Sequence, residues 1–308
     1  MSLAIIDTPT IARRRPRPSR DVTREVTYAH SAKSLLGRTL IRSVENATGR
    51  LSLMRRAEGY EEDVAAGLDF WRVMMERFGL RLDVIRGSLG AIPATGPLVV
   101  VSNHPFGILD GLVLGHILSA VRGGDFRIVA HQVFQKAEDV NRAILPIDFS
   151  GTREAQSQNI ATRAEAIRYL KAGGAVGIFP GGTVATGATP MAEARDPVWR
   201  NFTAKMVTQS QATVVPLWFE GENSRLFQVS SHLHYLLRMS LLVREFAARA
   251  DQPVRLAVGR PIPHHEIASA AQSPKEVMDF LRRKTYDLSP NPSDWSVLGH
   301  EFEDNYRR

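Results

Sequence analysis

The sequence predicts an α/β protein built on a mixed, largely parallel sheet flanked by helices, with a helical extension at the N-terminus. Three observations lead to this prediction. Short apolar runs typical of buried strands recur between residues 98 and 258, segments with helical spacing separate most of them, and no internal repeat is present. At 308 residues, the chain can bury a large core without disulfides or a structural metal.

Six apolar runs are predicted to be strands, and five other segments are predicted to be helices. The strands cover residues 98–101, 127–130, 144–147, 175–179, 213–219 and 254–258. The helices cover residues near 111–121, 157–171, 198–210, 231–249 and 274–286. Because strands and helices alternate, functional residues are expected at the carboxyl ends of the strands.

The chain before the first strand divides into segments of different character. Residues 1–27 are predicted to be a flexible basic arm, because residues 13–20 read RRRPRPSR and combine prolines with dense positive charge. Residues 28–57 are predicted to form a basic amphipathic helical segment, which can lie on an anionic bilayer or dock on the main domain. The main domain is predicted to span residues 58–290, starting with a helix over 60–80, and a C-terminal tail follows over 291–308.

Composition excludes several kinds of site. The chain contains no cysteine, so cysteine nucleophiles, cysteine-based zinc sites and iron–sulfur clusters are excluded, and no metal site is predicted. The net charge of +7 suits an anionic membrane surface, a nucleic acid or an acidic protein, and charge alone does not choose among them. We expect a protein that is neither secreted nor membrane-spanning, because apolar residues precede the first charges and no run of about 18 apolar residues occurs.

The most informative motif is LVVVSNHPFGILDG, in which a predicted strand ends in Asn103 and His104 and Asp110 lies six residues after the histidine. If the turn at Gly107 folds back, the carboxylate of Asp110 can fix the imidazole tautomer and leave the other nitrogen to take a proton. His104 and Asp110 are therefore the candidate catalytic pair. The alternative is that Asp110 only caps the next helix and that His104 is a buried structural histidine.

A second motif, AVGIFPGGTVATG, ends another predicted strand in a glycine turn. The backbone N–H groups around Gly181 to Thr183 can hold an oxyanion or a phosphate. Ala188 stands where a nucleotide-binding loop needs its lysine, so a nucleotide site is rejected. No G-x-S-x-G motif supports a serine nucleophile.

Together the two motifs resemble the glycerolipid acyltransferase superfamily. Asn103, His104 and Asp110 match the Asn-His and aspartate of the lysophospholipid acyltransferase branch, with five residues inside the pair instead of the commoner four. The block Phe-Pro-Glu-Gly-Thr of that branch corresponds to Phe179, Pro180, Gly181, Gly182 and Thr183, where Gly181 replaces the glutamate. The His-Pro-x-Gly and Pro-Gly-Gly blocks of the diacylglycerol acyltransferase branch also match, at His104 to Gly107 and Pro180 to Gly182.

A downstream block extends the resemblance to about residue 260. It is similar to a block of the diacylglycerol branch in Arg200, Lys205, Val215, Pro216, Gly221, Glu222 and Asn223. The resemblance implies that Glu222 and Asn223 belong to the site. It also places Arg153 about where the superfamily has an acceptor-phosphate ligand, although a solvated arginine at a helix entrance fits this position equally.

The resemblance implies an O-acyltransferase domain over residues 58–290. We expect it to move a fatty acyl group from acyl-CoA or acyl carrier protein to a hydroxyl of a lysophospholipid or related lyso-lipid, without a further cofactor. Alternative acceptors are a neutral glyceride and a lyso-aminolipid. A peripheral location on the cytoplasmic face of the inner membrane is expected, where an anionic membrane surface is a partner.

Two further questions stay open in the sequence. The predicted helix near residues 231–250 combines leucines with Arg238, Arg244 and Arg249, and it can line an acyl groove, rest on lipid or belong to the core. The alternative of another class is a basic nucleic-acid- or lipid-binding protein without catalysis. No nucleic-acid motif accompanies the basic arm, so no nucleic acid is expected.

Overall fold

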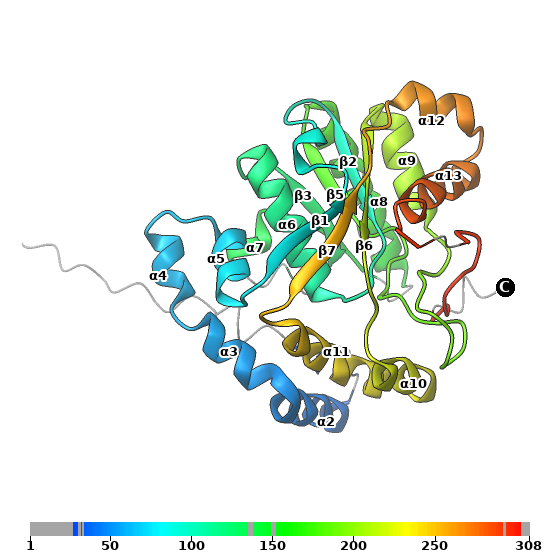
Figure 1. The fold of residues 1–308 in the computed structure, drawn as a ribbon. Coiled ribbons are helices and arrows are strands. Elements are labelled where there is room, and N and C mark those ends of the chain that lie inside the picture. Colours follow the sequence, from blue (N-terminus) through cyan, green and yellow to red (C-terminus); the bar gives the residue numbers. More distant parts are fainter. Residues whose placement is uncertain are drawn as a thin grey trace, which may run out of the picture.

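A seven-stranded mixed sheet with helices on both faces forms the centre of the protein (Figure 1). The computed structural model describes residues 27–29, 32, 34–132, 134, 138–148, 152–291 and 294–302, so most of the predicted basic arm lies outside the described residues. The strands are β1 (Arg81–Arg86), β2 (Leu98–Ser102), β3 (Arg127–His131), β4 (Ile144–Ile147), β5 (Ala175–Ile178), β6 (Thr213–Phe219) and β7 (Pro253–Val258).

Helices precede, connect and follow these strands. Before β2 are α2 (Leu35–Glu45), the π-helix η2 (Asn46–Arg50), α3 (Leu51–Ala57), α4 (Tyr60–Ala65), α5 (Phe70–Arg77) and the short 3-10 helix η3 (Leu89–Ala91). After β2 come α6 (Ile108–Arg122), α7 (Glu138–Asn141), α8 (Arg153–Lys171), α9 (Asn201–Ser210), α10 (Arg225–Leu233), α11 (Tyr235–Arg249), α12 (His264–Ala270) and α13 (Pro274–Tyr286).

The strand order is β1-β7-β6-β2-β5-β3-β4. Every neighbouring pair is parallel except β6 and β7, so β1 and β7 run against the other five strands. The predicted fold class is confirmed, and all six predicted strands are present within about one residue of their expected ends. Sequence analysis missed β1, whose RLDVIR sequence alternates polar and apolar residues at the edge of the sheet.

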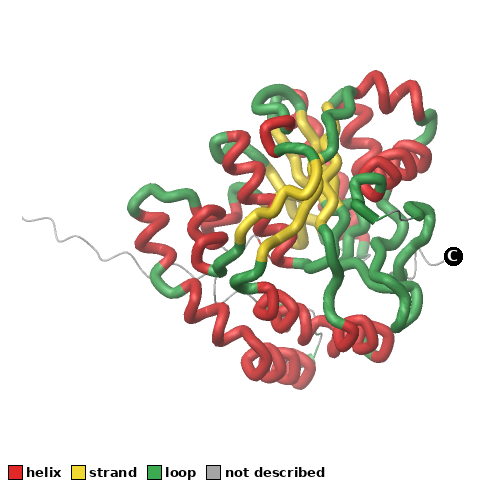
Figure 2. The backbone as a smooth tube through the Cα atoms, viewed as in Figure 1, coloured by secondary structure: helices red, strands yellow, loops and turns green. Residues whose placement is uncertain are grey.

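Each face of the sheet supports its own core, because successive side chains of a strand point to opposite faces. On β2, Leu98 and Val100 pack with α5, α6 and α11, whereas Val99 and Val101 pack with α8, α9 and α13. All five residues of β2 are buried, as expected for a central strand covered on both sides. Figure 2 shows helices on both sides of the sheet.

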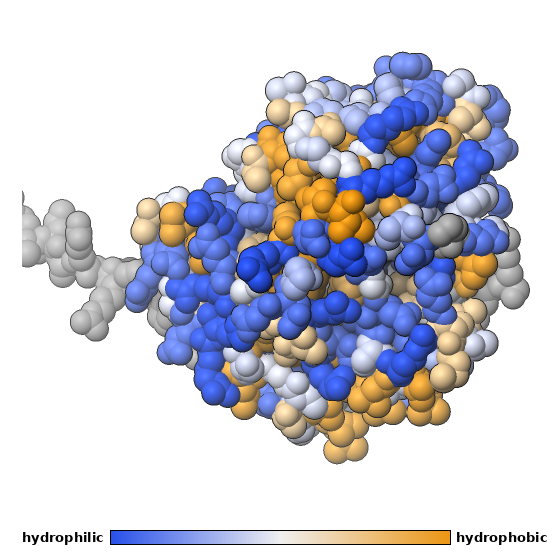
Figure 3. Space-filling view, viewed as in Figure 1, coloured by the Kyte–Doolittle hydropathy of each residue, from blue (hydrophilic) through white to orange (hydrophobic). Residues whose placement is uncertain are grey.

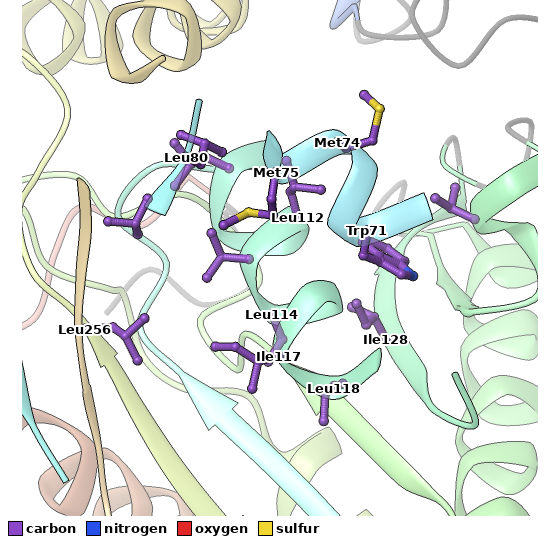
Figure 4. Close-up of a cluster of buried hydrophobic side chains, with 14 of the residues drawn as sticks. Trp71, Met74, Met75, Leu80, Leu112, Leu114, Ile117, Leu118, Ile128 and Leu256 are labelled. Carbon is purple, nitrogen blue, oxygen red and sulfur yellow. The ribbon is translucent and has the colours of Figure 1, made fainter. Parts of the chain in front are cut away.

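The first of these cores contains a contact that fixes α5 against α6. The Trp71 ring lies beside α6 near Leu112 and Ile128 (Figure 4). A Cβ atom at Gly115 of α6 would come within 2.2 Å of that ring, so glycine is required for this approach. The Trp71 ring thereby fixes the distance between α5 and α6.

The predicted helix over residues 60–80 is interrupted. Gly67, with φ +93°, ends α4, and Asp69 accepts a hydrogen bond from the Arg72 N–H to begin α5. The predicted helix near 231–250 is also two helices. His234 is extended, and its Nδ1 accepts a hydrogen bond from the Leu236 N–H at the start of α11.

The N-terminal helical segment docks on the main domain by one side only. Ile41 of α2 is fully buried in a cluster with Val184 and residues of α11. Gly49 bends the segment, and a Cβ atom there would lie 2.5 Å from the Cβ atom of Ala247. The opposite side leaves Leu35 and Leu36 80% and 83% exposed. No helix among the described residues is long and apolar enough to cross a bilayer.

Candidate active site

His104 and Asp110 come together as the first motif predicts. The His104 Nδ1 atom lies 3.0 Å from Asp110 Oδ2. Asp110 is fully buried, and the His104 side chain is 17% exposed on the wall of a large cavity. The His104 Nε2 atom has no hydrogen-bond partner among the described residues, so it can accept a proton from a molecule in that cavity.

Asp110 makes the contacts of both alternatives that the sequence left open, and its catalytic role stays a prediction. It is in the first turn of α6, and its Oδ2 atom accepts hydrogen bonds from the backbone N–H groups of Phe106 at 2.7 Å and Gly107 at 3.0 Å. The same oxygen faces the His104 ring. Gly107 takes φ +86° and ψ −120°, a conformation that an L-residue rarely adopts. The turn at Gly107 thereby brings the pair together despite the additional residue between them.

The backbone and ring of His104 are held separately. Its N–H donates to Asp196 Oδ1 at 3.1 Å, and its ring stacks on Phe179 with centroids 4.1 Å apart. Burial raises the pKa of Asp196, while Arg282, the Trp199 indole and the His104 N–H oppose this shift. The backbone N–H, the Nδ1 atom and the ring face of His104 are therefore each held by a contact before any substrate binds.

The glycine turn lies beside the pair, because β5 and β2 are parallel neighbours whose carboxyl ends coincide. The Ala185 N–H donates to the His104 carbonyl oxygen at 2.7 Å, and the Gly182 N–H closes the turn on Phe179. The N–H groups of Gly181 and Thr183 have no acceptor among the described residues. A Cβ atom at Gly181 would meet Asp196 at 3.2 Å, which leaves little room for the glutamate of the related motif.

Besides Asp110 and Gly181, which are adjacent in sequence to lining residues, four predicted site residues do not border the cavity. The Asn103 amide donates to the Phe219 carbonyl oxygen at 2.9 Å and accepts from the Phe219 N–H at 2.7 Å, which joins the ends of β2 and β6. Glu222 and Asn223 follow β6 but do not border the cavity. Arg153 is the exposed first residue of α8 and does not border it either. Their proposed part in substrate binding stays a prediction.

The cavity beside His104 has a volume of about 1450 Å³ and is lined unevenly. One part is apolar, with walls from α5, α6, β3 and β4 that include Trp71, Met74, Leu112, Ile128 and Ile144. Another part is polar and includes Thr183, Ser231, His232, Arg238 and His300. Such a cavity suits an amphipathic ligand that has an acyl chain and a polar group.

Residues 300–302 form part of the cavity wall. The His300 N–H donates to the Thr186 carbonyl oxygen at 3.0 Å, and the His300 ring contacts the His232 ring with centroids 4.5 Å apart. Glu301 pairs with Arg200 through two hydrogen bonds of 2.9 Å. The predicted C-terminal tail thus contributes directly to the cavity.

Sequence reasoning missed three residues of this site. Tyr28 borders the cavity and is positioned by its N–H, which donates to buried Glu45 at 2.6 Å. Asp196 lies in no motif that sequence analysis recognised. The helix that carries Arg238 was expected to line an acyl groove, rest on lipid or belong to the core, and Arg238 itself is only 1% exposed and borders the cavity. An arginine among leucines and methionine in YLLRMSLL was the available signal for a buried cation.

Comparison with known proteins agrees with this geometry. A sequence model of the acyltransferase family matches residues 62–294, and the chain belongs to this family. It is an O-acyltransferase of the glycerolipid acyltransferase superfamily, so the predicted resemblance and enzyme class are confirmed.

Similar proteins include two lyso-glycine lipid O-acyltransferases. The one from Phocaeicola vulgatus is 26% identical over 228 residues, which cover 72% of this chain and 78% of the relative. The one from Bacteroides thetaiotaomicron is 22% identical over 228 residues, which cover 72% of this chain and 80% of the relative. A crystal structure of the 1-acyl-sn-glycerophosphate acyltransferase PlsC from Thermotoga maritima is similar with a TM-score of 0.43 and 15% identity, over 86% of this chain and 87% of that chain.

Proposed function

We propose that this acyltransferase moves an acyl group from a thioester to the hydroxyl of a lyso-lipid, with His104 as general base. The observation that carries the proposal is the 3.0 Å contact between His104 and buried Asp110 at the edge of a partly apolar cavity. Asp110 holds Nδ1 protonated, so Nε2 is the basic nitrogen. The family match supplies the reaction class.

The proposed reaction needs no covalent enzyme intermediate. His104 Nε2 removes the proton of the acceptor hydroxyl as its oxygen bonds to the thioester carbonyl carbon. The resulting oxyanion accepts hydrogen bonds from the N–H groups of Gly181 and Thr183, for which the described residues offer no acceptor. The carbon–sulfur bond then breaks, and the leaving thiolate takes the proton from the imidazolium. Asp110 stabilises that imidazolium while it exists.

The acceptor we favour is a lyso-lipid with an amino-acid head group. The two relatives named as lyso-glycine lipid O-acyltransferases support this choice over a lysophospholipid. Glycine has no side-chain hydroxyl, so an acceptor in which its amine is acylated must carry the reacting hydroxyl on the acyl chain. The apolar part of the cavity suits that chain.

The donor we propose is acyl-CoA or acyl carrier protein, and the reaction needs no other cofactor. The net charge of +7 favours approach of a polyanionic donor of either kind. The decisive assay incubates the purified protein with N-(3-hydroxyhexadecanoyl)glycine or lysophosphatidic acid and either donor, and detects the diacylated product by mass spectrometry. We expect product from the glycine acceptor. A lack of product in every combination would indicate a lipid-binding protein without catalysis and contradict the proposal.

We also propose that the protein docks on an anionic membrane through α2, α10 and α11. Apolar side chains gather at the lower edge of the molecule, where these helices lie (Figure 3). They include Leu35, Leu36 and Leu40 of α2 and Leu233 and Leu237 of α10 and α11, each at least 40% exposed. Arg38 on α2 adds positive charge beside them, as in helices that lie in a bilayer interface.

Replacing Leu35 and Leu36 together with glutamate is expected to weaken vesicle binding at least about tenfold. Burying one leucine contributes roughly 1.5–3 kcal/mol, and the new charges are repelled by anionic lipid. Flotation with vesicles of phosphatidylglycerol and phosphatidylethanolamine measures the change. Ile160→Glu on α8 is the matched control, since Ile160 is 59% exposed on another helix. Unchanged binding by the double variant would exclude α2 from the docking surface.

A further inference from the structure

Arg238 is a buried cation on the wall of the active-site cavity. It is 1% exposed, and its guanidinium makes four hydrogen bonds, all to uncharged oxygens. Nη1 donates to the hydroxyls of Thr186 at 2.5 Å and Ser231 at 3.0 Å. Nη2 donates to the Thr183 hydroxyl at 3.2 Å and the Val184 carbonyl oxygen at 2.7 Å. These bonds join α10 and α11 to the glycine turn.

The charge of Arg238 has no counter-ion among the described residues. The groups that act on it electrostatically are the phenols of Tyr235 and Tyr28 and the rings of Phe227 and Phe302, whose centroids lie 5.0 and 4.1 Å from the Arg238 Cζ atom; none of these side chains is a carboxylate. Burial lowers the pKa of Arg238 to about 9, so the side chain is still cationic at neutral pH. Arg282 is also buried, but the carboxylate of Asp196 lies within its electrostatic range. A buried charge is costly unless an opposite charge compensates it. At Arg238, an anionic ligand in the cavity can supply that opposite charge.

The Thr183 hydroxyl, which contacts Arg238, can donate a hydrogen bond to a ligand in the cavity. Arginine has no acceptor, so the hydroxyl oxygen must accept from Arg238 and its own proton is available to another group. The hydroxyls of Ser231 and Thr186 instead lie 2.7 and 3.2 Å from backbone carbonyl oxygens to which they donate. The Thr183 hydroxyl has no acceptor among the described residues, and Thr183 borders the cavity.

We propose that Arg238 and Thr183 bind the carboxylate of the acceptor's head group. The inference rests on the proposed function and identifies how its acceptor is recognised. One uncompensated cation matches one carboxylate charge, whereas a phosphate monoester carries nearly two charges at neutral pH. The other arginines and lysines of the cavity wall are Arg200, which is neutralised by Glu301, and Arg163 and Lys205, which are partly exposed and exposed to solvent, respectively. Arg238 is therefore the one among them that is both buried and without a counter-ion among the described residues. The carboxylate accepts from the Thr183 hydroxyl and lies against the Arg238 charge.

The test compares two acceptors that differ only in this charge. N-(3-hydroxyhexadecanoyl)glycine and its glycinamide have the same chain and the same reacting hydroxyl. We expect the wild-type protein to prefer the carboxylate by about 10- to 100-fold in kcat/KM, mainly through KM. In Arg238→Gln this preference is expected to fall close to one, because the acid loses its counter-charge and the amide has no charge that needs one. Arg238→Lys keeps the charge and is expected to retain part of the preference.

Further variants separate recognition from structural support. Thr183→Val is expected to reduce the preference for the carboxylate, and Thr183→Ser to restore it. Arg282→Lys is the matched control, because Arg282 is a buried arginine that does not border the cavity. Its ratio of kcat/KM between the two acceptors should equal that of the wild-type protein. If Arg238→Gln does not fold, Arg238→Lys and Thr183→Val still decide the question through this ratio.

Three outcomes would overturn the inference. Equal loss on both acceptors in the Arg238 and Thr183 variants would mean that they support the turn or the oxyanion. Equal use of both acceptors by the wild-type protein would mean that the carboxylate is not recognised. A larger loss on lysophosphatidic acid than on the glycine acceptor would assign Arg238 to a phosphate. Failure of the wild-type protein on all three acceptors contradicts the proposed function itself.

Discussion

Replacing His104 with alanine is expected to lower acyl transfer by about 10²- to 10⁴-fold or more, with little change in stability. General base catalysis typically contributes this factor, and no other described group has both a free basic nitrogen and a buried carboxylate partner beside the cavity. The ring borders the cavity, so its removal enlarges existing space more than it creates a closed void. Rates with saturating donor, together with the thermal unfolding midpoint, measure both effects.

His265→Ala is the matched control for this experiment, because His265 is an exposed histidine on α12. Its activity should equal that of the wild-type protein. Turnover by purified His104→Ala within tenfold of wild type would show that the acceptor hydroxyl is deprotonated by another group.

Asp110→Asn is expected to cause the second largest loss, about 10²-fold or more in kcat, while stability changes by only about 1 kcal/mol. An asparagine oxygen can still accept from the N–H groups of Phe106 and Gly107, so the cap of α6 survives. The neutral amide cannot stabilise the imidazolium of His104. Activity and unfolding free energy should therefore respond very differently to this substitution.

Asp110→Ala supplies the comparison. It removes the carboxylate and the cap together and leaves two buried N–H groups without a partner, which is expected to cost about 1–3 kcal/mol. Equal activity of Asp110→Asn and the wild-type protein would reduce Asp110 to a helix cap, the alternative that the sequence itself suggested.

The central strands could be predicted because both faces of each are buried, which produces continuous apolar runs such as LVVV and AVGI. Edge strand β1 could not, since its partly exposed faces give a mixed pattern. Helix interruptions depend on single residues, and the effect of each is decided by its contacts with residues distant in the sequence. Gly49 bends the N-terminal segment because Ala247 lies against it, and no local pattern reveals that neighbour.

The geometry of the site was predictable where motif and strand end coincide, as at His104, Asp110 and the glycine turn. The geometry of His104 and Asp110 matches the expectation, and only mutation can test whether the two act together in catalysis. Asp196 and Arg238 could not be assigned roles in advance. Each reaches the site from a segment distant in sequence, and its role follows from its hydrogen bonds to His104 and to the glycine turn.

The contribution of residues 300–302 to the cavity has a consequence for the order of events during synthesis on the ribosome. Chains emerge from the N-terminus, so the whole sheet and the His104–Asp110 pair are made before this segment. Until then, Arg200 lacks its contact with Glu301, and the cavity lacks the part of its wall that His300, Glu301 and Phe302 form. A nascent chain can therefore have a nearly complete scaffold and still lack one wall of its active site.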